Sequence, residues 1–545
     1  MHLAEHVFKR LRECQVDCTF GIPGDFILPL YAAQAEAGMR TIVCTHEPGA
    51  AFAADAYARL RGLGVVLVTY GAGALNVVNA AAMSYAEHTP LLVISGAPET
   101  TQRGPDVYIH HRVKSFESQL RIFREITIEA ACIDDPATAG SKIDRVIGAV
   151  IRHKRPGYLE IPRDLVNACI APTETPLAAI HDAPVVDPAA LNEVVAEIIE
   201  RLEVADRPAL YVGVGVRRYN VAAEAVRLAE RWALPVVSSV MGKASFPESH
   251  SQFAGIYMGA LGDQTARSTL EDSDCVLTLG VIQSDVNTGF WTSQLDSNRQ
   301  IQTNDDSVTI GYHRYDGIPF SSIVSMLAKH RPSQSRRFAP RPKKCDLPCR
   351  TAGSLETADV IAQVRMLDQS KYTFVADVGD AWFVGLELRT DIFLAPGYYA
   401  TMGFAVPGAL GSGIAQPNRR PFVLVGDGAF QMTGCELATL ATQNLRPIVL
   451  LLNNSSYMML ESLDRSRPYY ALRSWDYVGF ARTLGCSGER VATAEELNAA
   501  LRRAEAADRP YLIEAVLNKD DLSPVMRRIR DHVMAARAVT IPLCP

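Results

Sequence analysis

The apolar residues of this chain gather in short runs that alternate with segments of helical periodicity. Short apolar runs bounded by turn residues are typical of buried strands. The strands predicted in this way lie at 41–44, 65–69, 91–95, 158–162, 209–212, 236–239, 275–279, 422–425 and 447–452. They fall into three blocks, and strands that alternate with helices favour open parallel sheets. We therefore expect three open parallel-sheet α/β domains.

Two stretches without clear periodicity separate the blocks. Residues 171–185 are rich in proline and alanine, and residues 331–348 carry prolines and several basic side chains, which we interpret as a solvated connector. We therefore predict a first domain at 1–168, a central domain at 185–330 and a third domain at 354–522. A C-terminal helix and tail at 523–545 should follow. Three domains also suit a chain of 545 residues.

Composition narrows the classes of function. Hydrophobic residues make up 48% of the chain and charged residues 21%, which is ordinary for a globular protein with large cores. A net charge of −6 gives no basis for a nucleic-acid or membrane partner. No apolar stretch approaches the roughly 18 residues of a membrane span. The polar N-terminus is unlike a signal peptide, and the 11 cysteines form no Cys-x-x-Cys pair, so we expect a cytoplasmic protein.

A split motif in the third block carries the most specific chemistry. Gly426-Asp427-Gly428 follows one predicted strand, and Asn453-Asn454 follows the next after 24 intervening residues. A helix predicted at 433–444 between them makes a βαβ unit, so both loops should lie at the carboxyl edge of one sheet. Glycines let a backbone approach a diphosphate, and carboxylate and amide oxygens suit Mg²⁺. The motif thus predicts a diphosphate and magnesium site.

Three further clusters lie in the first block. Gly21-Ile22-Pro23-Gly24-Asp25 follows a short strand, Glu47 opens a helix, and His110-His111 form a doublet. Taken alone, a glutamate in the first turn of a helix is more often a cap that interacts with the helix dipole. A histidine pair in a loop is ordinarily polar surface. The clusters gain significance only together with the split motif.

In this combination the chain resembles the thiamine-diphosphate-dependent 2-oxo acid decarboxylases, which include the pyruvate, indolepyruvate/phenylpyruvate and branched-chain 2-oxo acid decarboxylases. The likeness covers nearly the whole chain and is strongest to bacterial phenylpyruvate/indolepyruvate decarboxylases. It implies a pyrimidine-binding domain, a central domain and a diphosphate-binding domain, with thiamine diphosphate and Mg²⁺ as cofactors. It also implies a cofactor that lies between the first domain of one subunit and the third domain of its partner. A homodimer is then the minimum, and a homotetramer is expected.

The resemblance assigns the catalytic roles. Glu47 should bind N1′ of the aminopyrimidine and favour its imino tautomer, whose nitrogen removes the proton from the thiazolium C2. The apolar residues around Glu47 favour the neutral acid, which can donate this hydrogen bond. Asp25, His110 and His111 should form the acid–base group that transfers protons around the substrate.

Other positions follow from the same resemblance. Asp427 and Asn454 should bind Mg²⁺ through their side chains and Ser456 through its carbonyl, while Asn453 braces the turn. Met402 should support the folded shape of the cofactor. The full set of expected cofactor contacts is Glu47, Thr69, Gly379, Asp380, Met402, Gly426, Asp427, Gly428, Ala429, Asn454 and Tyr457. The expected substrate pocket comprises Trp382, Met459, Leu460 and Leu463.

Leu460 departs from the pattern of the pyruvate decarboxylases. They carry a catalytic glutamate six residues after the second asparagine of the motif, where this chain has Leu460. Glu461 is the next residue, but one step along a helix turns a side chain by about 100°. Glu461 should therefore not substitute for the missing glutamate without a shift in register. One subgroup of bacterial phenylpyruvate/indolepyruvate decarboxylases also has leucine here. By contrast, a bulky Trp382 favours smaller or aliphatic side chains, so the physiological substrate stays open.

The resemblance therefore implies non-oxidative decarboxylation of hydrophobic 2-oxo acids to an aldehyde and CO₂, through a cofactor ylide and an enamine. Phenylpyruvate, indolepyruvate and medium aliphatic or branched-chain 2-oxo acids are the expected substrates. The alternatives are a pyruvate decarboxylase or another carboligase or lyase of this cofactor, such as an acetohydroxyacid synthase. Asp25 with the histidine doublet argues against the synthase. A catalytically silent homologue is a further alternative, which Leu460 alone supports.

Overall fold

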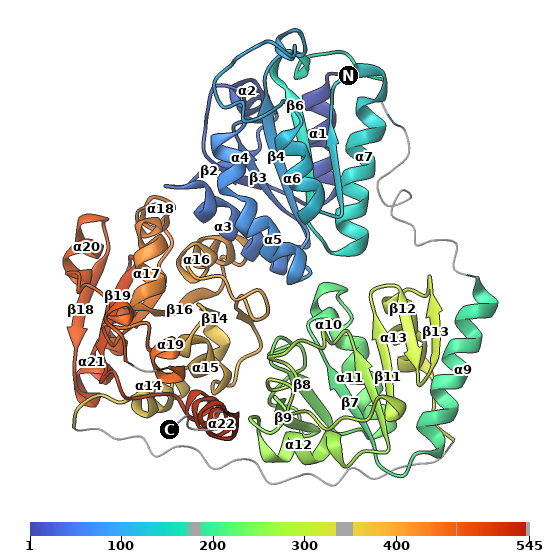
Figure 1. Cartoon of the computed structure of the whole chain (residues 1–545), viewed down its shortest axis with the longest axis vertical. Helices are drawn as coiled ribbons and strands as arrows, with labels where there is room; N and C mark the ends of the chain where they lie inside the picture. Colours follow the sequence, from blue (N-terminus) through green and yellow to red (C-terminus); the bar gives the residue numbers. More distant parts are fainter. Residues whose placement is uncertain (172, 174–186, 334–352, 465, 541–545) are drawn as a thin grey trace.

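The computed structural model describes residues 1–171, 173, 187–333, 353–464 and 466–540. The predicted connectors lie almost wholly outside these residues, as does the predicted start of the central domain at 185. Three α/β units are arranged around a common junction, with the first at the top of Figure 1 and the other two below it. The predicted fold class is confirmed.

The first unit is a six-stranded sheet in which every pairing is parallel, in the order β2-β1-β3-β4-β6-β5. All four strands predicted here are present. The strands are β1 (Cys18–Gly21), β2 (Arg40–Val43), β3 (Gly64–Val68), β4 (Leu91–Ala97), β5 (Glu129–Cys132) and β6 (Gly157–Pro162). The helices are α1 (Leu3–Glu13), α2 (Leu28–Glu36), α3 (Glu47–Arg61), α4 (Ala72–Asn76), α5 (Val78–Ala86), α6 (Ser118–Ile126) and α7 (Pro136–His153).

The central unit is a seven-stranded sheet in the order β13-β12-β11-β10-β7-β8-β9. Its strands are β7 (Pro208–Val212), β8 (Val236–Ser239), β9 (Phe253–Tyr257), β10 (Cys275–Leu279), β11 (Gln300–Asn304), β12 (Ser307–Ile310) and β13 (His313–Asp316). Its helices are α9 (Pro188–Val204), α10 (Gly215–Arg218), α11 (Ala222–Trp232), α12 (Gln264–Glu271) and α13 (Phe320–Lys329).

One edge of this central sheet corrects the expectation of an all-parallel sheet. β11 and β12 pair antiparallel, as do β12 and β13. The two tight connections that make this possible contain Asp305 and Gly311, both at positive φ, as hairpin turns require. These edge strands are short and partly polar, so their apolar pattern is weak.

The third unit is a six-stranded parallel sheet in the order β15-β14-β16-β17-β19-β18. Its strands are β14 (Tyr372–Ala376), β15 (Phe393–Leu394), β16 (Arg420–Gly426), β17 (Ile448–Asn453), β18 (Ser487–Val491) and β19 (Tyr511–Val516). Its helices are α14 (Thr357–Arg365), α15 (Asp380–Leu386), α16 (Ala405–Ala415), α17 (Asp427–Thr433), α18 (Leu437–Thr442), α19 (Met458–Leu463), α20 (Tyr477–Thr483), α21 (Ala494–Ala506) and the C-terminal α22 (Pro524–Thr540).

The single helix predicted at 433–444 is wrong in its start and its continuity. Helix α17 already begins at Asp427, directly after β16, and ends at Thr433. A short 3₁₀ turn, η5 (Gly434–Glu436), separates it from α18. The predicted βαβ unit itself is confirmed, because β16 and β17 are parallel neighbours with Gly426 opposite Leu452.

The first and third units share one hydrophobic core. Buried residues of both units belong to the same apolar cluster, with α3 and α16 side by side at its centre (Figure 1). The helices approach so closely that a Cβ on Gly411 would lie 1.9 Å from the carbonyl oxygen of Ala53. Phe52 and Phe404 meet edge to face at 6.0 Å. The central unit has a separate main core.

A buried ionic network holds α1 against α7. Asp144 is buried, and its carboxylate accepts hydrogen bonds from Nε and Nη2 of Arg10, each at 2.8 Å. His6 Nε2 lies 2.9 Å from the same carboxylate. Burial alone would raise the pKa of Asp144, but the hydrogen bonds from His6, Arg10 and Thr173 outweigh it and lower the pKa to about 2.

We expect Asp144→Asn to lower the free energy of unfolding by about 3 kcal/mol at pH 7, because it removes the buried charge that faces Arg10. A depressed carboxyl pKa stabilises the fold above the unfolded-state value of 3.8. The wild-type advantage should therefore shrink as the pH falls from about 4 towards about 2. Urea unfolding of both proteins across this range measures it. Asp134→Asn, which breaks the exposed pair with Lys142, should cost less than about 1 kcal/mol. Equal losses would contradict the prediction.

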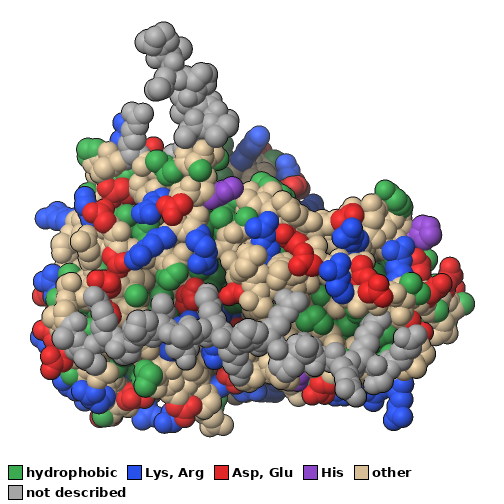
Figure 2. All heavy atoms as spheres, turned by 90° about the horizontal axis from the view of Figure 1, so that it is seen from below, with side chains coloured by type: hydrophobic (Ala, Val, Ile, Leu, Met, Phe, Trp, Pro, Cys, Tyr) green, Lys and Arg blue, Asp and Glu red, His purple; other side chains and the backbone are tan. Residues whose placement is uncertain are grey.

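The surface shows a mixed distribution of charge. Figure 2 shows acidic and basic side chains interspersed over the face seen from below. Among the described residues, no helix has both the length and the apolar character that crossing a membrane would need.

Candidate active site

The split motif forms a compact site at the carboxyl edge of the third sheet. Asp427 is the first residue of α17, and its side chain is buried. Its carboxylate accepts hydrogen bonds from the backbone N–H of Gly428 at 2.9 Å and of Ser455 at 2.7 Å. Burial raises the pKa of Asp427 to about 6, although these N–H groups act to lower it. Both halves of the motif are thus joined through one carboxylate.

The two asparagines have different environments. Asn453 donates to Glu514 at 2.8 Å and accepts from the backbone N–H of Ser455 at 3.1 Å, so it braces the turn as predicted. Asn454 is half-buried, and its side-chain oxygen accepts only a 3.1 Å bond from the N–H of Ser456 among the bonds recorded for the described residues. Ser455 makes the sharp turn with a φ of 57°.

The residues of this edge suit a magnesium diphosphate. Asp427, Asn454 and the Ser456 carbonyl are all oxygen donors, which Mg²⁺ prefers. No heavy atom lies within 4 Å of a Cβ built on Gly379 or Gly426, so open space faces both glycines. Among the described residues, no three His, Cys, Asp or Glu side chains gather into a metal site. A cation here would therefore depend on amide and carbonyl oxygens besides Asp427.

The predicted residues of the first unit also form one cluster. Glu47 is the first residue of α3, and its Oε2 accepts a hydrogen bond from the side-chain amide of Asn76 at 3.1 Å. A Cβ on Gly73 would lie 3.6 Å from Glu47 Oε1 and 3.1 Å from Thr69, which places the two side chains on the same side. The Thr69 hydroxyl is buried and has no hydrogen-bond partner among the described residues. An unsatisfied buried hydroxyl fits a site that receives a ligand.

Asp25 and His110 are 85 residues apart in sequence, yet His110 Nε2 lies 2.6 Å from Asp25 Oδ2. The imidazole of His110 stacks on Phe26 at 4.7 Å, and His111 Nδ1 lies 2.8 Å from the carbonyl of Tyr70. The side chains of Asp25 and His110 are 44% and 57% exposed in the single chain. Burial acts to raise the pKa of Asp25, but the hydrogen bond and charge of His110 lower it overall.

This pair adjoins the Glu47 cluster. A Cβ on Gly24, the neighbour of Asp25, would lie 2.6 Å from the Cβ of Thr69. A Cβ on Gly71 would lie 2.3 Å from the carbonyl of His111, and Gly71 has a φ of 63° that suits glycine. All five residues that the sequence predicted for this half of the site are therefore brought together: Asp25, Glu47, Thr69, His110 and His111.

The predicted pocket residues lie around α19 and α22. Trp382, Met459 and Leu463 belong to or pack against a hydrophobic cluster that includes Met526 and Ile529 of α22. Leu460 is 54% exposed.

Other residues in and beside α17 and α19 make hydrogen bonds or packing contacts within the chain. Glu461 accepts hydrogen bonds from the hydroxyls of Ser456 at 2.5 Å and Ser466 at 2.6 Å. Tyr457 packs against Gly428, where a Cβ would lie 2.6 Å from its ring, and Ala429 is buried in the shared core.

Comparison with known proteins fits this geometry. Three models of the thiamine pyrophosphate enzymes match: the N-terminal TPP binding domain at residues 1–122, the central domain at 195–325 and the C-terminal TPP binding domain at 377–515. An indole-3-pyruvate decarboxylase of Azospirillum brasilense is 37% identical over 538 residues, with 97% of each chain covered. The chain belongs to the thiamine-diphosphate-dependent 2-oxo acid decarboxylase family. The resemblance seen in the sequence is confirmed.

Other members of this decarboxylase family match over similar lengths. A probable pyruvate decarboxylase of Schizosaccharomyces pombe is 30% identical, with 96% of this chain and 94% of the relative covered. An alpha-keto-acid decarboxylase of Mycobacterium tuberculosis is 31% identical, with 97% and 96% covered. Each matched domain falls within one of the three α/β units, and the chain carries thiamine-diphosphate-binding domains.

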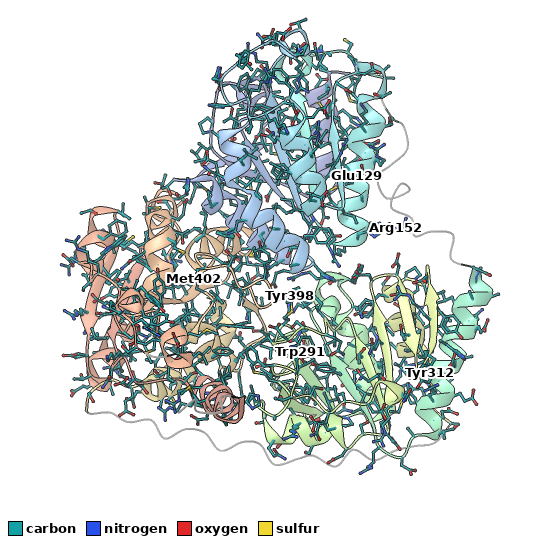
Figure 3. The ribbon with its side chains drawn as sticks, in the orientation of Figure 1. Glu129, Arg152, Trp291, Tyr312, Tyr398 and Met402 are labelled. Atoms are coloured by element: carbon teal, nitrogen blue, oxygen red, sulfur yellow. The ribbon has the colours of Figure 1, made fainter. Side chains whose placement is uncertain are left out.

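A buried carboxylate of the third domain, Asp377, was not predicted from the sequence. Asp377 accepts backbone hydrogen bonds from Gly403 at 3.0 Å and Ala405 at 2.8 Å, on either side of the turn after Met402. Burial raises the pKa of Asp377 to about 6, although these bonds act to lower it. Met402 itself packs against the shared core close to α16 (Figure 3). An acid directly after the apolar run of β14 was the available signal.

Asp380, a predicted cofactor contact, faces the C-terminal helix. Its Oδ2 accepts a hydrogen bond from the backbone N–H of Ser523 at 2.9 Å, just before α22 begins. Its Oδ1 is buried and has no hydrogen-bond partner among the described residues. Burial raises the pKa of Asp380 to about 6.

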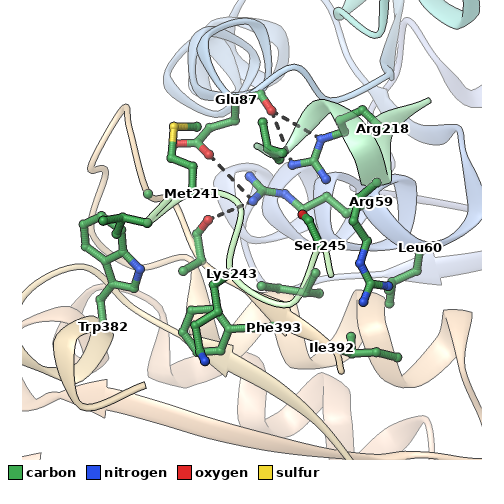
Figure 4. A pocket seen from close by; sticks show the side chains of 16 residues that line it. Arg59, Leu60, Glu87, Arg218, Met241, Lys243, Ser245, Trp382, Ile392 and Phe393 are labelled. Atoms are coloured by element: carbon green, nitrogen blue, oxygen red, sulfur yellow. Dashed lines mark hydrogen bonds and ion pairs between the residues drawn. The ribbon is translucent and has the colours of Figure 1, made fainter. Parts of the chain in front are cut away.

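A cavity lies where the three domains meet, with about 40 Å³ of free volume (Figure 4). Arg59 lies 3.8 Å from the buried carboxylate of Glu87, and Arg218 donates to the backbone carbonyl of Glu87 at 3.3 Å. Glu87 Oε1 also accepts the backbone N–H groups of Tyr398 and Tyr399 at 2.5 and 2.9 Å. Arg59 is twelve residues along α3 from Glu47, a distance of about 18 Å. The cavity is therefore separate from the Glu47 cluster.

Proposed function

We propose that the protein is a non-oxidative 2-oxo acid decarboxylase that uses thiamine diphosphate and Mg²⁺ to release CO₂ and an aldehyde. The observation that carries the proposal is the cluster of Asp25, His110, Thr69 and Glu47, which unites an acid–base pair with a helix-start glutamate. The relatives support it, since their names describe indole-3-pyruvate, pyruvate and alpha-keto-acid decarboxylases that match over nearly their whole length.

In this proposal the third domain holds the diphosphate end of the cofactor. Asp427, Asn454 and the Ser456 carbonyl bind Mg²⁺, which neutralises the buried anionic charge of the diphosphate. Met402 supports the rings. The remaining contacts come from Gly379, Asp380, Gly426, Gly428, Ala429 and Tyr457. When bound, the cofactor supplies the carbon nucleophile and accepts the electron pair that CO₂ leaves behind.

The first domain supplies the proton chemistry. Glu47 holds a proton at its carboxyl group for the pyrimidine ring, and Thr69 lies beside it. Asp25 orients the imidazole of His110 through their 2.6 Å contact, and His110 and His111 donate and accept protons at the substrate oxygen and carbon. The partial exposure of this pair suits a group that exchanges protons with solvent between turnovers.

We further propose that the cofactor lies between subunits, so that a homodimer is the minimum and a homotetramer the expected state. Residues 1–168 then form the pyrimidine-binding domain, 185–330 the central domain, 354–522 the diphosphate-binding domain and 523–545 the C-terminal helix and tail. Light scattering coupled to gel filtration measures the assembly, and an active monomer would contradict it.

Hydrophobic 2-oxo acids are the proposed substrates. Leu460 places an exposed apolar side chain where pyruvate decarboxylases carry a glutamate, and Trp382, Met459 and Leu463 are the other proposed pocket residues. A coupled-dehydrogenase assay with pyruvate, 2-oxoisovalerate, 2-oxohexanoate, phenylpyruvate and indolepyruvate tests this. We expect higher kcat/KM for the hydrophobic acids than for pyruvate. The reverse order would favour a pyruvate decarboxylase, and acetolactate as the product from pyruvate would favour a synthase.

Leu460→Glu is expected to raise kcat/KM for pyruvate by about tenfold or more, because it supplies an additional acid near the substrate. Affinity for thiamine diphosphate should stay unchanged. Leu460→Gln is the matched control, since it has the same size and polarity without the acid, and it should leave pyruvate turnover low. Equal kinetics for Leu460→Glu and wild type would mean that residue 460 lies away from the substrate.

A further inference from the structure

A buried carboxylate of the third domain is hydrogen bonded to the segment that carries Glu47. Glu436 ends the η5 turn and is 1% exposed. Its Oε1 accepts hydrogen bonds from the backbone N–H of Thr45 at 3.0 Å and from the Thr45 hydroxyl at 2.7 Å. Its Oε2 accepts a bond from the Thr439 hydroxyl at 2.7 Å. Each oxygen of this carboxylate is therefore used, one towards the first domain and one towards its own.

The residues that contact Glu436 lie on both sides of the start of α3. Thr45 lies two positions before Glu47, and His46 between them is the N-cap of α3. The same carboxylate oxygen faces Gly49, where a Cβ would lie 2.3 Å from Glu436 Oε1. The first turn of α3 thus packs directly on Glu436, while the preceding loop is hydrogen bonded to it. Glu436 therefore contacts the chain on both sides of the N-cap of α3.

The segment that ends at Glu436 begins at Asp427, a residue of the proposed metal site. Glu436 lies nine residues after Asp427, at the end of α17 and η5. Between them, the Thr433 hydroxyl donates to the Gly403 carbonyl at 2.8 Å, next to Met402. The segment from Asp427 to Glu436 therefore makes hydrogen bonds at its start, near its middle and at its end. These bonds restrict the movement of Glu436, which contacts the loop before Glu47.

We propose that Glu436 is a positioning residue for Glu47. It acts through Thr45 by fixing the start of α3 and so the direction in which the Glu47 carboxyl group faces the pyrimidine ring. This inference rests on the proposed function of Glu47. Glu436 touches neither substrate nor cofactor in this scheme, so its loss should impair activation of the cofactor more than binding of either ligand.

The test uses holoenzyme loaded with thiamine diphosphate and Mg²⁺. The rate at which the C2 proton of the bound cofactor exchanges with deuterium, measured by rapid quench and NMR, reports what Glu47 does before substrate arrives. We expect Glu436→Ala to lower this rate and kcat by about tenfold or more, with KM and the Kd of thiamine diphosphate within about twofold of wild type. Thr45→Val, which removes only the hydroxyl, should give a smaller decrease in both rates, and Thr45→Ser should restore them.

Thr439→Val is the matched control, because it removes the other hydrogen bond of the same carboxylate without touching the Glu47 segment. Its exchange rate should stay near wild type. The inference is overturned if Glu436→Ala and Thr45→Val exchange at the wild-type rate, or if Thr439→Val slows exchange as much as Thr45→Val does. If Glu436→Ala does not fold, the exchange rate of Thr45→Val compared with that of Thr439→Val tests the inference. If wild-type enzyme exchanges no faster than the free cofactor, the proposed function of Glu47 itself fails.

Discussion

Replacing Glu47 with glutamine is expected to lower kcat by about 10²- to 10⁴-fold, because the amide cannot hold the acidic proton that the pyrimidine ring needs. The side chains have almost the same shape, so the hydrogen bond from Asn76 and the start of α3 should persist. Decarboxylation of a hydrophobic 2-oxo acid at saturating thiamine diphosphate and Mg²⁺ measures the loss.

A suitable control is Glu224→Gln in the central domain. Glu224 also lies in the first turn of a helix, α11, where it pairs with Arg227 at 2.6 Å. A glutamate that only stabilises a helix end should be replaceable at little cost to turnover. Normal turnover by Glu47→Gln would remove the basis for the proposed mechanism.

Asp427→Ala is expected to weaken Mg²⁺-dependent binding of thiamine diphosphate by at least about 100-fold, since changes even to groups behind metal ligands cost 10- to 100-fold. The substitution removes a charged oxygen donor and also leaves the N–H groups of Gly428 and Ser455 without their acceptor. Titration calorimetry with thiamine diphosphate at fixed Mg²⁺ measures the affinity.

The control for this change is Asp476→Ala, because Asp476 also lies at the start of a helix of the third domain. Its side chain accepts a hydrogen bond from the N–H of Gly479 and caps α20. Loss of this cap should cost about 1 kcal/mol of stability and leave cofactor affinity unchanged. If Asp427→Ala bound the cofactor as tightly as Asp476→Ala, Asp427 would not be a metal ligand.

The fold could be predicted from the sequence wherever strands are buried on both faces. The runs at 209–212 and 422–425 lie within β7 and β16, because continuous apolar residues leave few alternatives. The edge strands β12 and β13 lack that signal, since every residue of β13 has some exposure to solvent. The break between α17 and α18 includes Glu436, which is hydrogen bonded to Thr45 of the first unit, and no local pattern marks this contact.

Some residues of the candidate site could be predicted from the sequence, and others could not. The βαβ motif around Asp427 follows from residues that are close in sequence, so spacing alone predicts it. The contact between Asp25 and His110 spans 85 residues and was expected only because the chain resembles a known family. Three buried carboxylates were not predicted: Asp377, Glu87 and Glu436. Each accepts hydrogen bonds from backbone N–H groups of a distant segment, and such contacts leave no pattern in the sequence.

The close crossing of α3 and α16 restricts how the subunit can move. With backbone against backbone at Gly411 and Ala53, the two cofactor-binding domains form a single rigid block. An interface that is large and apolar resists hinge motion. Any rearrangement during turnover is then expected in the loops at the sheet edges, because the central domain, although it has its own main core, also shares a buried apolar cluster with the third domain.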